Sequence, residues 1–127
     1  MSAATRLLVV EDDKDILYLV LKHLVKNGFE PDGFSDPIKA LDAFKANSTK
    51  YALVLSDIRM PGMNGVDLAS QVLTINPNVK VILMTAYDII PDDLRSKMPV
   101  VSVEDIIRKP FRLVEIWSRV KQLVNAN

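Results

Sequence analysis

Five polar side chains stand at the ends of short apolar runs, where packing in a core would not select them. Glu11 and Asp12 follow the run RLLVV, and Asp57 follows ALVLS. Thr85 closes the run KVILMT, and Lys109 follows DIIR. We expect these groups to converge, because the carboxyl ends of parallel strands meet at one edge of a sheet.

Carboxylates gathered without a cation repel one another, so such a cluster either takes up protons or binds a hard divalent metal. Magnesium prefers oxygen ligands in octahedral geometry and commonly binds one or two protein carboxylates together with phosphate oxygens. Calcium requires more ligands than Glu11, Asp12 and Asp57 offer. The acidic cluster therefore predicts a Mg2+ site.

Asp57 is the candidate nucleophile of this group, because a carboxylate can accept a phosphoryl group and form an acyl phosphate. The hydroxyl of Thr85 and the ammonium of Lys109 are donors that, together with magnesium, could neutralise the equatorial oxygens of a transferring phosphoryl group. The loop IRMPGMNG follows Asp57. Its glycines and proline turn the chain, and the loop can present a backbone carbonyl to the metal.

Apolar runs alternate with amphipathic patterns along the chain. Short runs rich in Val and Leu predict buried parallel strands at Arg6–Val10, Ala52–Ser56 and Lys80–Thr85, with an edge strand at Phe29–Phe34 and a fifth strand at Asp105–Arg108. A first helix is predicted between Asp13, its N-cap, and Gly28, its C-terminal stop. Further helices are predicted at Pro37–Ala46, Val66–Ile75, Asp92–Lys97 and Leu113–Val124. Five such repeats predict a doubly wound α/β sheet with right-handed crossovers.

Composition excludes several classes of protein. The 127 residues are 49% apolar and contain 16 basic and 16 acidic side chains, with no basic patch of the kind that binds nucleic acid. Without cysteine there is no disulfide, thiol catalysis or cysteine-bound metal. No apolar run approaches the roughly 20 residues of a membrane span. We expect a cytoplasmic protein that forms one domain over residues 1–127, with its core at about 5–125.

Four segments, VVEDD, SDIRMPGMNG, MTA and KPF, occur in that order between Leu7 and Val124. Together they resemble the receiver domain of two-component response regulators. Each segment is common by itself, but four in order at strand ends are specific. The resemblance implies a flavodoxin-like (βα)5 fold with strand order 2-1-3-4-5 and a phosphoacceptor function in two-component or phosphorelay signalling.

The resemblance implies a role for each residue of the site. Asp57 would accept a phosphoryl group from a sensor histidine kinase or a phosphotransfer protein. Thr85 would hydrogen-bond that group, and Lys109 would form an ion pair with it. The implied metal ligands are Asp12, Asp57, the backbone carbonyl of Arg59 and, through a water, Glu11. Transfer would be self-catalysed and followed only by slow dephosphorylation, so the chain would not be an enzyme in the ordinary sense.

Phosphorylation is expected to draw Thr85 inward and to change the face formed by the fourth helix, fifth strand and fifth helix, which an output partner reads. The family usually has an aromatic residue three positions before the lysine, whereas this chain has Ile106. Tyr87 is an alternative moving ring. The bond Lys109–Pro110 is predicted to be cis, as is common in the family. Whether phosphorylation also makes a dimer is left open.

Two alternative functions use the same residues. A magnesium-dependent phosphohydrolase would also form an aspartyl phosphate, but such enzymes carry a second Asp two residues after the nucleophile, where this chain has Arg59. A degenerate receiver would bind partners without phosphorylation, which Ile106 favours and the complete acidic site does not. The sequence also leaves open whether the chain is a stand-alone regulator or part of a longer protein.

Overall fold

The computed structural model describes residues 5–86, 96 and 105–125. Within these ranges, five strands form one parallel sheet in the order β2-β1-β3-β4-β5, which confirms the expected topology. The strands are β1 (Arg6–Val10), β2 (Glu30–Phe34), β3 (Leu53–Asp57), β4 (Lys80–Thr85) and β5 (Asp105–Arg108). Asp57 is therefore the last residue of its strand rather than the first residue after it.

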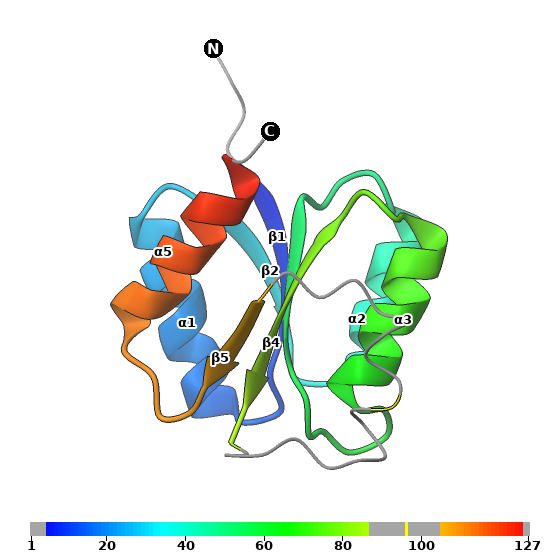
Figure 1. Cartoon of the computed structure of the whole chain (residues 1–127), viewed down its shortest axis with the longest axis horizontal. Helices are drawn as coiled ribbons and strands as arrows, with labels where there is room; N and C mark the ends of the chain where they lie inside the picture. Colours follow the sequence, from blue (N-terminus) through cyan, green and yellow to red (C-terminus); the bar gives the residue numbers. More distant parts are fainter. Residues whose placement is uncertain (1–4, 87–95, 97–104, 126–127) are drawn as a thin grey trace.

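Helices cover both faces of the sheet (Figure 1). They are α1 (Lys14–Lys26), α2 (Pro37–Ala46), α3 (Gly65–Ile75) and α5 (Leu113–Val124). Helices α1 and α5 lie on one face, and α2 and α3 lie on the other (Figure 1). The predicted helix at Asp92–Lys97 lies, apart from Ser96, outside the described residues. Among the helices of the described ranges, none is long and apolar enough to cross a membrane.

Alternating side chains of the central strands enter two separate cores. In β1, Leu7 and Val9 pack under α1 and α5, whereas Leu8 and Val10 pack under α2 and α3. All four side chains are fully buried. Because both faces of the sheet are covered, the central strands are continuous apolar runs rather than alternating ones. Polar side chains in such a strand are therefore informative.

The ends of α1 follow from two residues that the sequence singled out. The side chain of Asp13 accepts hydrogen bonds from the backbone N–H groups of Asp15, at 3.0 Å, and Ile16, at 3.2 Å, as expected of an N-cap. Gly28, just beyond the helix, has a φ of 92°, which favours glycine. The first helix thus begins directly after the acidic pair, and that pair stays at the end of β1.

The edge strand β2 has the polar sequence EPDGF and is held by a network around Asp32. Arg6 donates to both carboxylate oxygens of Asp32, at 3.0 and 3.1 Å, and also bonds Glu30 at 2.7 Å. The Tyr51 hydroxyl donates to Asp32 at 2.6 Å, and the Lys50 ammonium lies 3.1 Å away. One carboxylate therefore links β2 to the start of β1 and to the segment before β3.

We expect Asp32→Asn to lower the free energy of unfolding by about 1–3 kcal/mol, because three donors lose a charged acceptor. Burial raises the pKa of Asp32, but its hydrogen bonds and ion pairs outweigh burial and hold the pKa below its usual value. At pH values at which Asp32 is already protonated in the unfolded chain, it therefore stays ionised in the native state. Its stabilising contribution is lost as the pH falls below about 4.

Urea unfolding of the wild type and of Asp32→Asn at several pH values measures this difference. Asp42→Asn is the matched control, because Asp42 is exposed on α2. The stability difference should shrink towards acid pH in Asp32→Asn only. Equal stability of the wild type and Asp32→Asn near neutral pH would contradict the prediction.

Candidate functional site

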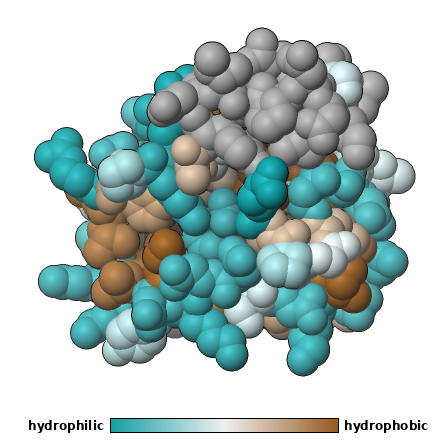
Figure 2. All heavy atoms as spheres, turned by 90° about the horizontal axis from the view of Figure 1, so that it is seen from below, coloured by the Kyte–Doolittle hydropathy of each residue, from teal (hydrophilic) through white to brown (hydrophobic). Residues whose placement is uncertain are grey.

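The polar residues singled out in the sequence gather at the carboxyl edge of the sheet. Glu11 follows β1, Asp57 ends β3, Thr85 ends β4 and Lys109 follows β5. Figure 2 views the molecule from this side and shows hydrophilic residues across the middle of the face, with hydrophobic patches on both sides. The topology thus brings together polar residues that are spread over most of the chain.

Three carboxylates form a compact cluster. One oxygen from each of Glu11, Asp12 and Asp57 can be chosen so that all three lie within 4.8 Å of one another. Glu11 is fully buried and Asp57 is 6% exposed, whereas Asp12 is exposed. Such a set offers hard oxygen ligands, and its exposed side leaves room for the waters that Mg2+ retains. These residues therefore fit a magnesium ion.

Lys109 lies between two of these carboxylates. Its Nζ is 2.5 Å from Oε1 of Glu11 and 3.3 Å from Oδ2 of Asp57. Its backbone N–H donates to the carbonyl of Thr85 at 2.7 Å, and its bond to Pro110 is cis, as predicted. With all groups ionised, three carboxylates and one ammonium leave two negative charges. A divalent cation would balance that excess.

Burial controls the ionisation of the cluster. It raises the pKa of Glu11 to about 7, against the hydrogen bond from Lys109. Burial also raises the pKa of Asp57, against the attraction of Lys109. For Lys109 itself, burial acts to lower the pKa, but the hydrogen bond to Glu11 and the charge of Asp57 raise it overall. Without a metal, the cluster therefore retains a proton that separate carboxylates would lose.

The loop after β3 closes tightly on Asp57. The N–H of Ile58 donates to the carbonyl of Met84 at 2.9 Å, and the N–H of Gly65 donates to the carbonyl of Ile58 at 2.7 Å. A Cβ atom at position 65 would overlap the carbonyl oxygen of Asp57. Helix α3 can begin this close to the site because residue 65 is glycine.

Four other residues were singled out in the sequence for the site or its switch. Thr85 is 1% exposed at the end of β4, and Arg59 has an exposed side chain two residues after Asp57. Ile106, at the position of the expected aromatic residue, is half-buried on β5. Tyr87 lies outside the described residues. The suggestion that Tyr87 supplies the moving ring therefore stays a prediction.

Two features of the site were not anticipated from the sequence. One is the ion pair between Glu11 and Lys109, whose partners are 98 positions apart. The other is Ser56, a buried residue whose hydroxyl donates to the backbone carbonyl of Asp57 at 2.9 Å. A hydroxyl inside the run ALVLS was the available signal for the second feature. No local pattern indicates the first.

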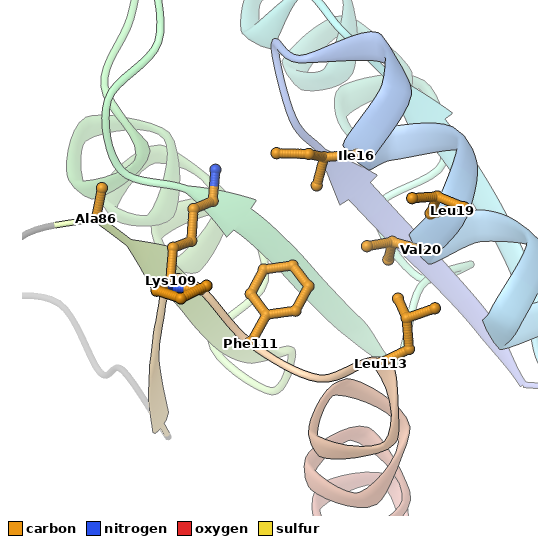
Figure 3. A pocket seen from close by; sticks show the side chains of 8 residues that line it. Ile16, Leu19, Val20, Ala86, Lys109, Phe111 and Leu113 are labelled. Atoms are coloured by element: carbon orange, nitrogen blue, oxygen red, sulfur yellow. The ribbon is translucent and has the colours of Figure 1, made fainter.

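An apolar cleft of about 460 Å3 lies beside the site, between α1 and the connection from β5 to α5. Figure 3 shows Ile16 and Val20 of α1 on one side of it and Phe111 on the other, with Leu113 near its end. Lys109 also lines the cleft, while its Nζ reaches the carboxylates. The same side chain thus borders the cleft and offsets part of the negative charge of the site.

We expect Lys109→Met to destabilise the metal-free protein by about 1–3 kcal/mol near pH 8, because buried carboxylates lose their cation. The native state then keeps protons on Glu11 and Asp57 that the unfolded chain releases above about pH 4.5. Stability must therefore fall as the pH rises from about 5 to 8, more steeply in the variant than in the wild type. Added Mg2+ should restore most of the loss.

Urea unfolding followed by circular dichroism, with and without Mg2+, measures this effect. Lys39→Met, at an exposed position on α2, is the control for loss of a positive charge. A variant as stable as the wild type at about pH 8 without metal would show that Lys109 does not stabilise the carboxylates.

Comparison with known proteins supports the resemblance to receiver domains that the sequence motifs indicate. The family model described as the response regulator receiver domain matches residues 7–121. The transcriptional regulatory protein TctD of Salmonella typhimurium is 34% identical over 119 residues, which cover 94% of this chain and 51% of TctD. The chain thus spans about half the length of this curated relative.

Two solved structures agree with the fold. The response regulator protein TrrA from Thermotoga maritima, in complex with Mg2+ and BeF, is 32% identical and has a TM-score of 0.78, with 94% of this chain and 98% of that chain covered. A CheY-like receiver domain protein from Methanospirillum hungatei has a TM-score of 0.87 at 24% identity, with coverages of 97% and 95%. Because the family model extends over most of the sequence and the fold agrees, the chain belongs to the response regulator receiver domain family.

Proposed function

We propose that this receiver domain takes a phosphoryl group onto Asp57, with Mg2+ bound at the acidic cluster. The observation that carries the proposal is the placement of the Asp57 carboxylate. It is nearly buried, shares a cluster with Glu11 and Asp12, and lies 3.3 Å from the ammonium of Lys109. An aspartate with only a structural role at a strand end requires neither neighbouring carboxylates nor an ammonium group beside it. A phosphoryl acceptor needs nearby cations that neutralise the transferring group.

Magnesium would be held by Asp12, Asp57 and the backbone carbonyl of Arg59, with Glu11 acting through a water. When bound, the ion supplies positive charge that neutralises the oxygens of the transferring phosphoryl group and orients that group. The exposed side chain of Asp12 leaves the cluster open to solvent, from which a phosphodonor can approach. Glu11, by contrast, is fully buried.

The chain's own residues perform the transfer. A carboxylate oxygen of Asp57 attacks the phosphorus of a phosphohistidine, the phosphorus–nitrogen bond breaks, and the electron pair stays on the imidazole nitrogen. The imidazole leaves as a neutral group when its other nitrogen carries a proton. Lys109 then turns from Glu11 towards the new phosphoryl oxygens, and the Thr85 hydroxyl donates to one of them. Glu11, released from its ion pair, would help to hold Mg2+ through a water.

The partners follow from the same chemistry. A sensor histidine kinase or a phosphotransfer protein supplies the phosphoryl group, and an output partner reads the face made by β5, α5 and the helix that the sequence predicts at Asp92–Lys97. Of this face, the structure describes β5 and α5. TctD is a transcriptional regulatory protein about twice as long as this chain, so control of transcription is one output that we propose. We propose that the protein acts in the cytoplasm and that phosphotransfer requires neither contact of this domain with nucleic acid nor a membrane.

Incubation with phosphoramidate, followed by intact-mass measurement, tests the proposal. We expect the wild type to gain one phosphoryl group in the presence of Mg2+ and none without it. Asp57→Asn should keep its fold and gain none, because an amide is not a nucleophile for this transfer. Asp42→Asn is the matched control and should gain one group.

Three outcomes would contradict the proposal. Uptake by Asp57→Asn at the wild-type level would place the acceptor elsewhere. Absence of uptake by the wild type would favour a degenerate receiver that works without phosphorylation. Sustained release of phosphate from a phosphomonoester would favour a phosphohydrolase.

A further inference from the structure

We propose that Ser56 is a positioning residue for the phosphoacceptor. Its hydroxyl holds the peptide group between Asp57 and Ile58, and so anchors the backbone that carries the Asp57 carboxylate and sets the path of the chain to the Arg59 carbonyl. The inference rests on the proposed function of Asp57. It concerns a residue that neither binds metal nor touches the phosphoryl group.

The surroundings of Ser56 are apolar. In the register of the sheet, Ser56 pairs with Val10 on β1 and with Leu83 on β4, and both neighbours belong to the core under α2 and α3. Ser56 is itself 1% exposed. A buried hydroxyl costs free energy unless it is hydrogen-bonded, and an apolar side chain would serve packing better. The hydroxyl is therefore expected to have a role beyond packing.

That role lies in the peptide group that follows Asp57. The carbonyl oxygen of this group accepts the hydrogen bond from Ser56 Oγ at 2.9 Å. The N–H of the same group, on Ile58, donates to the Met84 carbonyl at 2.9 Å. Because a peptide group is planar, fixing its oxygen and its N–H fixes the orientation of the whole unit. The backbone between Asp57 and Ile58 is thereby held in one orientation.

Close packing makes the hydroxyl difficult to replace. The start of α3 presses against the Asp57 carbonyl so tightly that a Cβ at Gly65 would overlap its oxygen. Ile58 and Gly65 are both buried, so the surroundings leave little access for a substituting water. Without the Ser56 hydroxyl, the carbonyl would lose this hydrogen bond, and the peptide group would relax by rotating. The path of the chain towards Arg59 would then shift, and the Cα of Asp57 would lose this anchor.

A small rotation matters at this site, because transfer depends on the alignment of the attacking oxygen and on the distance between metal ligands. We expect Ser56→Ala to lower the rate of phosphorylation at saturating phosphoramidate and Mg2+ by about tenfold. Mg2+ affinity should fall by about threefold or more, because Asp57 and the Arg59 carbonyl are both expected ligands. The phosphoramidate concentration for half-maximal rate should change little.

The experiment compares Ser56→Ala, Ser56→Cys and Val54→Ala with the wild type. Val54 lies two residues earlier on β3, fully buried in the same core, so its truncation loosens packing without removing the hydrogen bond. Ser56→Cys keeps the size of the side chain but provides a weaker donor. Three quantities are measured: the phosphorylation rate, the Mg2+ dissociation constant by calorimetry, and hydrogen exchange of the Ile58 amide.

We expect Ser56→Ala to be phosphorylated more slowly and to bind Mg2+ more weakly. Its Ile58 amide hydrogen should exchange about tenfold faster, measured against the Leu55 amide as a reference. Ser56→Cys should lie between Ser56→Ala and the wild type, and Val54→Ala should match the wild type in Mg2+ affinity while it remains folded. Wild-type values in Ser56→Ala, or equal losses in Val54→Ala, would overturn the proposal. If the wild type takes up no phosphate, the proposed function fails, but Mg2+ affinity and exchange at Ile58 still decide the role of Ser56.

Discussion

The ammonium group of Lys109 lies between two buried carboxylates, and the organisation of the site depends on that ion pair. Removing Glu11 and Asp57 from water is costly, and one ammonium compensates for only part of the cost. The remaining charge favours either a retained proton or a divalent cation. Under the proposed function, this excess of negative charge would give the cluster its affinity for magnesium, and a bound cation would leave Lys109 available to a phosphoryl group.

The sheet supplies the rigidity that this arrangement needs. Both faces of β1 and β3 are covered, so the side chains of these strands are packed along their length. This packing holds the strand ends in fixed positions. The polar residues of the site lie at the carboxyl edge of the sheet, where the helices begin. Around Asp57, hydrogen bonds to Met84 and from Ser56 and the close approach of Gly65 fix the backbone. Stability in the cores thus offsets the cost of burying charge at their edge.

Local features of the sequence were sufficient to predict most of the fold. Apolar runs and helical periodicity predicted every described strand and helix to within one residue at most ends, and Asp13 and Gly28 marked the limits of α1. The acidic cluster and Lys109 were predicted because strand ends converge in a doubly wound sheet. The pairing of Glu11 with Lys109 was not predicted, since its partners are 98 positions apart and the register of the strands decides their contact. The hydrogen bond of Ser56 depends on backbone orientation, which periodicity does not encode.

Direct measurement of the ionisation of Glu11 tests the central claim. Carboxyl carbon chemical shifts, followed by NMR against pH with and without Mg2+, report this residue separately from the exposed acids. We expect Glu11 to titrate near pH 7 in the metal-free protein, because burial raises its pKa to about 7, and at clearly lower pH when Mg2+ is present. Titration of Glu11 at its ordinary value without metal, or a midpoint that Mg2+ does not move, would contradict the claim that burial with too few cations creates the metal site.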